Sequence, residues 1–269
     1  MRSEVDVRGA RGLLGVLVLV AGVAVARPAV AAQTVEEYVA LGDSYSSGLG
    51  TGDYDRPGGS CHRGPRAYPA LWAARHPDVE FRFLACSGAT TVTVATRRML
   101  EALGPETGLV TLTVGGNDAG FVDVMTTCVL SGDRDCARRA GRAVEFVRTE
   151  LPGRLDRTYA AIAARASSAE VVVFGYPRLF EIGACPGGLS RAKRAALNEA
   201  ADALAATTEQ RAGAAGFTFV DMRDRFAGHG VCAADPWINP LTSPLIESYH
   251  PNRLGHARAY LPALLAAAR

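Results

Sequence analysis

Five short apolar segments, separated by stretches with helical character, do most to restrict the fold of this chain. They are nearly continuous in apolar residues, which is typical of strands that are buried on both faces. Each of them ends at turn-forming residues, so each is bounded like a strand. The alternation predicts an α/β protein whose mostly parallel sheet is covered by helices on both faces. The segments are 37–41, 79–85, 109–114, 171–174 and 217–220.

The stretches between these segments predict five helices. Ser190 is a plausible N-cap of the fourth, and Pro262 should bend or end the fifth. With no repeat or linker in the sequence, the strands and their crossovers fill one domain over residues 33–269. Two Gly-rich stretches, 48–64 and 227–242, predict loops around the functional edge. The helices are expected at 67–75, 91–100, 140–166 with an interruption at Pro152-Gly153, 190–212 and 252–267.

Residues 1–32 have the pattern of a secretory signal peptide. A start with three arginines precedes an apolar run over 13–26, and small residues at Ala29 and Ala31 suit cleavage after residue 31 or 32. A membrane anchor is the alternative, but it needs ~20 apolar residues. We therefore expect an exported, extracellular chain without a stable membrane anchor.

The charge of the exported chain is balanced. The segment 1–32 takes four arginines and two acids from the 29 basic and 27 acidic residues, which leaves 25 of each. This balance gives no electrostatic reason to expect nucleic acid or an anionic membrane as a partner.

We expect the protein to need no cofactor and to be a monomer.

The cysteines predict disulfides. Their number is six, which is even, and the chain is expected to be exported. No Cys-x-x-Cys is present, which disfavours zinc. Spacing allows fifteen connectivities, and we predict the sequential one because each pair would join a loop to the segment after it. The predicted pairs are Cys61–Cys86, Cys128–Cys136 and Cys185–Cys232.

Candidate catalytic groups follow each of the first three predicted strands. Ser44 lies in Gly42-Asp43-Ser44 after the first, Gly88 follows the second, and Asn117 lies in Gly115-Gly116-Asn117-Asp118 after the third. In parallel strands these positions share one edge of the sheet, where ligands bind in such folds. Taken alone, Gly-Asp-Ser is an ordinary turn sequence. Together the three positions point to a site, in which Asp43 and Asp118 are expected to brace their turns.

A serine nucleophile needs a base, and His250 has the best position among the five histidines. It lies between the last strand and the last helix, and Glu247 precedes it by three residues, close enough to bond the imidazole. His76 is expected at the opposite edge of the sheet. The other three are expected at the surface: His62 and His229 in loops and His256 on the solvated face of the last helix.

These blocks, in this order along the chain, resemble the SGNH, or GDSL, hydrolases. The resemblance covers essentially the whole exported chain, and the six cysteines make it similar to the secreted actinobacterial lipases and esterases of that family. It implies a flavodoxin-like three-layer α/β/α sandwich with a five-stranded sheet, and it implies the same sequential disulfides. Two positions depart from the usual pattern: Glu247 replaces Asp, and Tyr45 replaces Leu. Some relatives use a backbone carbonyl in place of the acid.

By position, the resemblance implies Ser44 as nucleophile, His250 as general base and Glu247 as the acid. The N–H groups of Ser44 and Gly88 and the Asn117 amide would form the oxyanion hole. It implies a serine carboxylester hydrolase acting on lipid acyl esters, either triacylglycerols or phospholipids, through an acyl-enzyme. Deacylation of carbohydrates and a binding module without turnover remain alternatives. Apolar residues that flank the blocks are candidates for an acyl groove: Tyr45, Leu49, Phe121, Trp237, Ile238, Leu241 and Tyr249.

Two other hydrolase classes fit the sequence less well. A metal-dependent phosphoesterase usually needs clustered His and Asp ligands with an Asp-x-His pair, which this chain lacks. An α/β-hydrolase needs a Gly-x-Ser-x-Gly turn, and none occurs. We therefore expect no metal in the site.

Overall fold

The structure is a computed structural model that describes residues 1, 4, 35–55 and 59–268. The predicted signal peptide, apart from two isolated residues, lies outside the described residues. The predicted domain forms one compact unit over Gln33–Arg269. Within the described part of the chain, no helix is long and apolar enough to cross a membrane.

A single five-stranded parallel sheet forms the centre of the domain. Its strand order is β2-β1-β3-β4-β5. Strand β2 is added on one side of β1 and the later strands on the other, so the order of the strands reverses between β1 and β3. All four neighbouring pairs are parallel, which confirms the predicted sheet and its five strands. This is the flavodoxin-like order, whose ligand crevice lies at the reversal point. The strands are β1 Glu37–Ala40, β2 Glu80–Phe83, β3 Thr107–Leu112, β4 Glu170–Phe174 and β5 Thr218–Val220.

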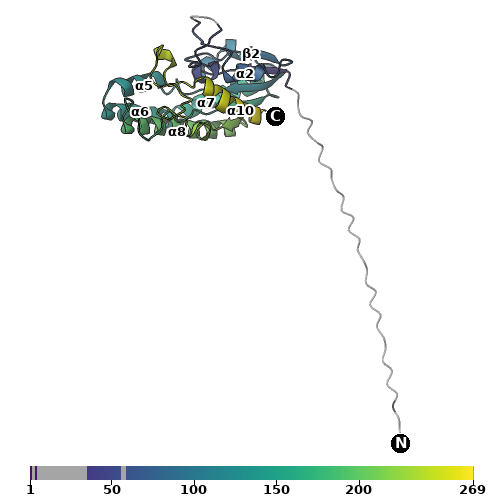
Figure 1. Cartoon of the computed structure of the whole chain (residues 1–269). Helices are drawn as coiled ribbons and strands as arrows, with labels where there is room; N and C mark the ends of the chain where they lie inside the picture. The colour runs from purple at the N-terminus through teal and green to yellow at the C-terminus, as the bar shows by residue number, and fades with distance from the viewer. Residues whose placement is uncertain (2–3, 5–34, 56–58, 269) are drawn as a thin grey trace. The chain divides into compact units, whose positions relative to one another are not determined.

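Helices cover both faces of the sheet, as predicted. On one face α2 packs against β2, α10 and the π-helical segment η3. On the other face α7 and α8 pack side by side, and α6 lies along α8 with α5 beside it (Figure 1). The helices are α1 Ser44–Ser47, α2 Tyr68–Ala73, α3 Thr91–Val94, α4 Arg97–Leu100, α5 Phe121–Leu130, α6 Asp133–Thr149, α7 Leu151–Arg165, α8 Arg191–Ala214, α9 Arg253–Gly255, η3 His256–Tyr260 and α10 Leu261–Ala267.

Several helix boundaries differ from the sequence prediction. The predicted helix 91–100 is two single turns, α3 and α4. The predicted helix 140–166 begins earlier, at Asp133, and is divided at Glu150, just before the expected break. Helix α5 was not predicted, because its valines and threonines favour strands rather than helices. The predicted cap is confirmed: the Ser190 side chain accepts a hydrogen bond from the Lys193 N–H.

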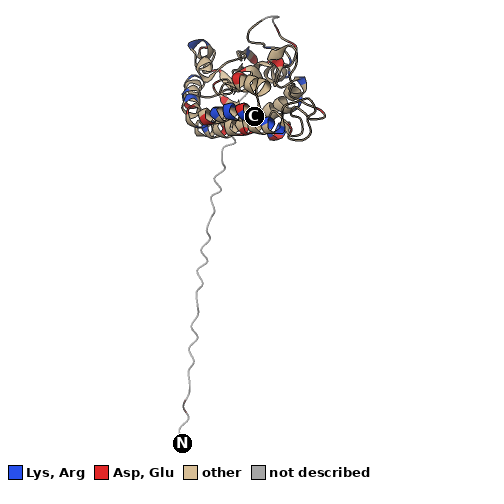
Figure 2. Cartoon of the chain, turned by 90° about the vertical axis from the view of Figure 1, so that its left-hand side faces the viewer, with Lys and Arg blue, Asp and Glu red and all other residues tan. Residues whose placement is uncertain are grey.

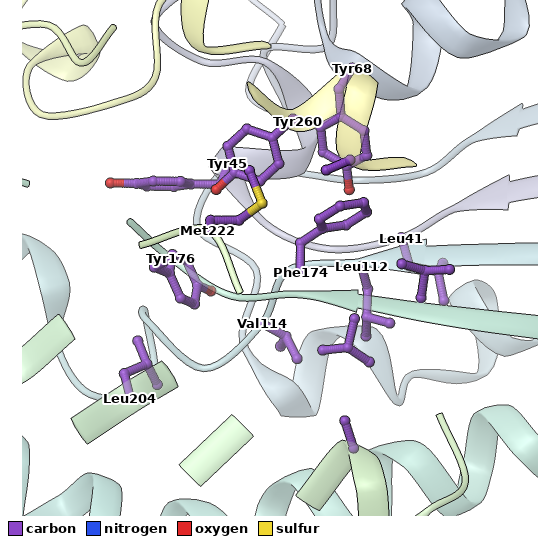
Figure 3. Close-up of a cluster of buried hydrophobic side chains, with 14 of the residues drawn as sticks. Leu41, Tyr45, Tyr68, Leu112, Val114, Phe174, Tyr176, Leu204, Met222 and Tyr260 are labelled. Atoms are coloured by element: carbon purple, nitrogen blue, oxygen red, sulfur yellow. The ribbon is translucent and has the colours of Figure 1, made fainter. Parts of the chain in front are cut away.

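The core between the sheet and the two helices α2 and α10 is rich in tyrosine. Tyr68, Phe174 and Tyr260 pack together there, with ring centroids 4.9–5.7 Å apart (Figure 3). The hydroxyls of these buried tyrosines find partners: that of Tyr68 lies 3.0 Å from Ser46 Oγ, and that of Tyr260 donates to the Gly175 carbonyl. These two tyrosines thereby add apolar contact without an orphaned polar group.

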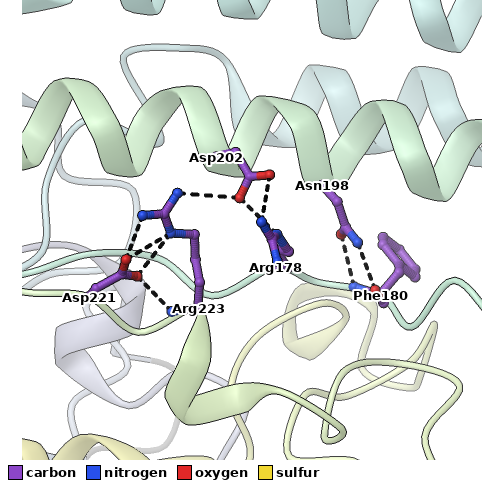
Figure 4. A network of polar contacts seen from close by, with 6 residues as sticks. All are labelled: Arg178, Phe180, Asn198, Asp202, Asp221 and Arg223. Carbon is purple, nitrogen blue, oxygen red and sulfur yellow. Dashed lines mark hydrogen bonds and ion pairs between the residues drawn. The ribbon is translucent and has the colours of Figure 1, made fainter.

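Polar contacts attach the segment after β4 to α8. Asn198 on α8 bonds both backbone groups of Phe180, and Asp202 one turn later pairs with Arg178 at 2.8 Å (Figure 4). Arg223, which follows β5, also reaches Asp202 and pairs with Asp221. The loops that leave β4 and β5 at the carboxyl edge are thus fixed to the same helix.

All three predicted disulfides are present: Cys61–Cys86, Cys128–Cys136 and Cys185–Cys232. The second joins α5 to α6. Basic and acidic residues alternate along the helices turned toward the viewer in Figure 2, as the blue and red segments of the ribbon show. Ion pairs between helices include Arg139–Asp123 from α6 to α5 and Arg211–Asp156 from α8 to α7.

Candidate active site

Ser44 lies at the first position of α1, directly after β1 and at the reversal point of the sheet. Gly42 makes this sharp exit possible: its φ is +115°, and a Cβ there would lie 2.7 Å from the Thr113 carbonyl. Only glycine fits such a conformation at such close approach. The nucleophile turn, residues 42–45, therefore packs directly against the end of β3.

Asp43 braces this turn, as predicted. Its carboxylate accepts hydrogen bonds from the Tyr45 N–H at 3.0 Å, from the Thr113 hydroxyl at 2.6 Å and from the Tyr176 hydroxyl. Burial raises the pKa of Asp43 to about 6, although these hydrogen bonds act in the opposite direction. The bonds connect the segments after β1, β3 and β4, so they hold the position of Ser44 rigidly.

His250 meets Ser44 at hydrogen-bond distance, 2.9 Å from Nε2 to Oγ. Its other ring nitrogen, Nδ1, lies 2.9 Å from the Ser248 carbonyl oxygen. Because a carbonyl can only accept, Nδ1 carries the proton and Nε2 accepts from the serine hydroxyl. Burial lowers the pKa of His250 to about 4. The imidazole is therefore neutral at physiological pH and able to take a proton.

The predicted bond between the Glu247 carboxylate and the His250 imidazole is not formed; the His250 backbone N–H instead donates to the Glu247 carbonyl at 3.4 Å. Glu247 ends a short 3-10 turn, Leu245–Glu247, and its carboxylate accepts a 2.6 Å hydrogen bond from the Tyr54 hydroxyl. The imidazole Nδ1 is instead occupied by the Ser248 carbonyl, two residues before it in the chain. A backbone carbonyl thus takes the place expected for the acid.

Gly88 and Asn117 line the same groove as Ser44 and His250. The Asn117 amide is fixed because Nδ2 donates to the Ala89 carbonyl at 2.9 Å, which leaves its second N–H free. The Gly88 N–H donates no hydrogen bond to any described residue. Asp118 braces its turn as predicted, since its carboxylate accepts from the N–H and hydroxyl of Thr91.

The groove above Ser44 is lined largely by apolar side chains. Four predicted groove residues line it: Leu49, Phe121, Leu241 and Tyr249.

A smaller apolar pocket adjoins this groove beside Ser44, and Tyr45 and Phe121 line it together with side chains of α5, α6 and α8. The prediction for Trp237 and Ile238 was wrong. Ile238 is fully buried, and Trp237 packs on the core with its ring stacked on His229.

Six further apolar groove residues escaped the sequence analysis. Those on α5 recur every three to four positions, which is the signal of a helix face. The four residues on α5 were missed because α5 itself was not predicted. The six residues are Val122, Met125, Val129 and Leu130 on α5, and Leu245 and Ile246 in the loop before His250.

The prediction for His256 was also wrong. It is fully buried rather than solvated, and its Nδ1 accepts a hydrogen bond from the Tyr68 N–H at 3.2 Å. The reason is that η3 turns this side of the last helix toward α2. His62 and His229 are in loops, as expected.

A flavodoxin-like sheet with a serine–histidine pair at the β1/β3 reversal point is the arrangement of SGNH-type hydrolases. The chain belongs to the GDSL-like lipase/acylhydrolase family, whose model matches residues 40–258. This confirms the family expected from the sequence blocks.

Streptomyces proteins are among its relatives. Lipase 1 of Streptomyces coelicolor is 48% identical over 262 residues, which are 96% of this chain and 97% of that protein. The crystal structure of phospholipase A1 from Streptomyces albidoflavus has a TM-score of 0.85 at 47% identity, covering 87% of this chain and 100% of that one. An extracellular lipase from Streptomyces rimosus has a TM-score of 0.83 at 49% identity, with 86% and 99% covered.

Proposed function

We propose that this protein is a carboxylic ester hydrolase that cleaves lipid acyl esters through an acyl-enzyme on Ser44. The observation that carries the proposal is the 2.9 Å contact between Ser44 Oγ and a neutral His250 at an apolar groove. The names of the relatives, lipase and phospholipase A1, support lipid esters as the substrate class.

His250 acts as general base and then as general acid. As Ser44 Oγ attacks the ester carbonyl, Nε2 takes the hydroxyl proton and later returns it to the leaving alcohol. A water molecule then attacks the acyl carbonyl: Nε2 takes a proton from the water and passes it to Ser44 Oγ as the bond from the acyl carbon to Oγ breaks, which releases the carboxylic acid and restores the serine. The Ser248 carbonyl holds Nδ1–H throughout, so it fixes the tautomer and stabilises the transient imidazolium.

The oxyanion is stabilised by the N–H groups of Ser44 and Gly88 and by the free N–H of Asn117. Neutral donors suit this task because they stay in place and do not ionise. One such donor contributes about 10²–10³ in turnover. Glu247 takes no part in proton transfer; it supports the loop before His250 through Tyr54.

The composition of the groove favours long acyl chains. None of its lining residues carries a charge at neutral pH, because burial keeps His250 neutral, and apolar side chains dominate. A sugar ring would leave most of the apolar wall of the groove without a matching partner. A fatty acyl chain, in contrast, gains about 0.8 kcal/mol for each buried methylene.

The test is a rate profile over esters of increasing acyl length, with a phosphatidylcholine included. We expect kcat/KM to rise with chain length in the wild type and Ser44→Ala to be inactive on every ester. Full turnover by Ser44→Ala would refute the nucleophile, whereas a preference for acetyl esters would refute the lipid substrate.

We propose further that the protein is secreted and acts as a monomer. Three disulfides, the segment 1–32 and the extracellular relative from Streptomyces rimosus support secretion. A site built wholly from one chain supports a monomer. N-terminal sequencing of protein from culture medium should give Ala32 or Gln33 first, and light scattering should give the mass of one chain.

A further inference from the structure

Exposed apolar side chains gather on two lips of the active-site groove. The helix lip is formed by Val122 and Leu130 on α5, and the loop lip by Leu241, Leu245 and Ile246. Their relative exposures run from 49% to 78%. Elsewhere in the domain, the described residues include only two other exposed large apolar side chains, Val92 at 67% and Leu265 at 43%.

Both lips are held in place beside the open groove. The helix lip begins at Gly120, whose φ is +80°, and the Cys128–Cys136 disulfide ties its end to α6. In the loop lip, Ser248 Oγ accepts from the Thr242 N–H at 2.9 Å. Apolar side chains fixed in this way at the surface mark an interaction site.

The charge around the lips indicates which kind of partner binds this surface. No Lys or Arg lines the groove, so nothing there attracts an anionic headgroup. A protein partner would gain from charged or hydrogen-bonding groups, but the five lip side chains carry none, and the one charged side chain of α5, Asp123, is paired with Arg139 on α6. An uncharged or zwitterionic lipid surface fits both the apolar character and the lack of charge.

We propose that the helix lip and the loop lip together dock on the surface of a neutral lipid aggregate, so that an acyl chain passes directly into the groove. This inference rests on the proposed function, because the aggregate is the source of the substrate. Docking is driven by burial of the five lip side chains rather than by electrostatics.

The experiment measures adsorption to phosphatidylcholine vesicles in an inactive Ser44→Ala background, so hydrolysis does not interfere. Adding Leu245→Ser and Ile246→Ser should weaken adsorption about 10- to 100-fold, from the apolar burial lost. The matched control, Leu265→Ser with Val92→Ser, removes equally exposed side chains elsewhere and should leave adsorption unchanged. Circular dichroism checks that each variant is folded.

Unchanged adsorption of the lip variant would overturn docking, as would adsorption only to vesicles with anionic phosphatidylglycerol. Hydrolysis of a water-soluble ester by the active wild type is assayed separately. Its absence would refute the proposed function and leave the adsorption result standing, so the two failures are distinguishable.

A second, independent observation concerns Tyr45, the residue after Ser44. Its buried hydroxyl donates a 2.8 Å hydrogen bond to the carbonyl of Tyr249, the residue before His250. Tyr249 has a φ of +62°, a left-handed conformation that is unfavourable for a residue with a side chain. The bond joins the two catalytic segments across 204 positions of the chain.

The Tyr45 ring also contacts both sides of the site. It lies 5.3 Å from the His250 ring and 5.1 Å from the Tyr176 ring, measured between centroids. Tyr176 in turn donates to the Asp43 carboxylate. The Tyr45 side chain thus connects Asp43, through Tyr176, to the loop that carries His250.

We infer that Tyr45 is a positioning residue, which holds the left-handed Tyr249 and thereby sets the distance from His250 to Ser44. Tyr45→Phe keeps the ring and removes only the hydrogen bond. We expect kcat to fall roughly 3- to 10-fold with KM unchanged. The rate at which an organophosphate labels Ser44 should fall by the same factor.

Tyr38→Phe is the matched control. Tyr38 is equally buried, and its hydroxyl lies 2.7 Å from that of Thr111 within the sheet, away from the groove. It should lose stability without losing kcat or labelling rate. Unchanged kcat in Tyr45→Phe, or an equal loss of kcat in both variants, would overturn the positioning role.

Discussion

Two histidines, six positions apart, show how much a site owes to its surroundings. Burial lowers the pKa of both, to about 4 for His250 and about 3 for His256. His250 lies in a loop at the carboxyl edge, and both of its nitrogens have partners, Ser44 and Ser248. His256 lies inside a helix against Tyr68, and its Nε2 has no partner among the described residues.

The comparison separates burial from function. A lowered pKa keeps both imidazoles neutral. A neutral ring nitrogen can accept a structural hydrogen bond from a backbone N–H, and it can equally accept a proton during catalysis. The difference is the group that each ring meets: a hydroxyl that opens on a groove for His250, and the backbone N–H at the start of α2 for His256. A shifted pKa alone therefore does not identify a catalytic residue.

Replacing each histidine should give the largest effects, on kcat for His250 and on stability for His256. His250→Gln removes the base, and we expect kcat to fall roughly 10⁴- to 10⁶-fold with little change in melting temperature. His256→Phe keeps a ring but leaves the Tyr68 N–H unpaired, which should cost about 1–3 kcal/mol of stability. The measurements are kcat per folded molecule and the unfolding free energy. A large loss of kcat in folded His256→Phe would contradict this division.

Asn117→Ala tests the oxyanion hole. It removes one oxyanion donor, so kcat should fall by about 10²–10³ while KM changes little. Steady-state kinetics on one soluble ester measure both constants. If kcat were unchanged, the oxyanion hole would consist of backbone N–H groups alone.

The pH dependence sharpens the comparison, because activity responds to His250 alone, whereas stability responds to both buried histidines. Free His250 is protonated only below about pH 4, so kcat/KM should be flat near neutrality and fall tenfold per pH unit well below 4. An apparent pKa near 6.5 in the kcat/KM profile would show that His250 is not desolvated.

Stability should fall at higher pH than activity does. Unfolded His256 binds a proton near its ordinary pKa of about 6.5, whereas the folded chain holds His256 neutral down to about pH 3. The unfolded state therefore holds more protons between these values, and stability drops as the pH falls through that window. Asp43, with its pKa raised to about 6, acts in the opposite direction between about pH 4 and 6.

His256→Phe should flatten this dependence. Without a titrating side chain at position 256, the loss of unfolding free energy on acidification is smaller than in the wild type. Denaturant unfolding at pH 7, 5.5 and 4 measures it. An equally steep loss in the variant would assign acid sensitivity to other groups.

Glu247→Gln should have the smallest effect. The Ser248 carbonyl, rather than this carboxylate, holds the imidazole, so we expect a loss of kcat of less than roughly tenfold, within the range of one hydrogen bond. Tyr54→Phe breaks the same contact from its other side and should match it. A loss comparable to that of His250→Gln would restore Glu247 as the catalytic acid.

Much of the fold was predictable because its signals are local. Five apolar strands bounded by turns predicted the parallel sheet. An even number of cysteines in a chain expected to be exported predicted disulfides, and joining each loop to the segment after it predicted their pairing. Helix α5 was not predictable in this way, since its residues favour strands and only packing on α6 makes them helical. Most of the groove wall that was missed belongs to it.

By itself, the sequence determined which chemical groups reach the carboxyl edge. Parallel strands must end together, so Ser44, Gly88 and Asn117 were fixed at one edge as soon as the strands were recognised. Only the tertiary structure decided the distances and the surroundings: that Ser248 rather than Glu247 holds His250, that His256 is sealed in the core, and that two lips stay exposed. Those outcomes depend on contacts between residues far apart in the chain, and no local pattern encodes them.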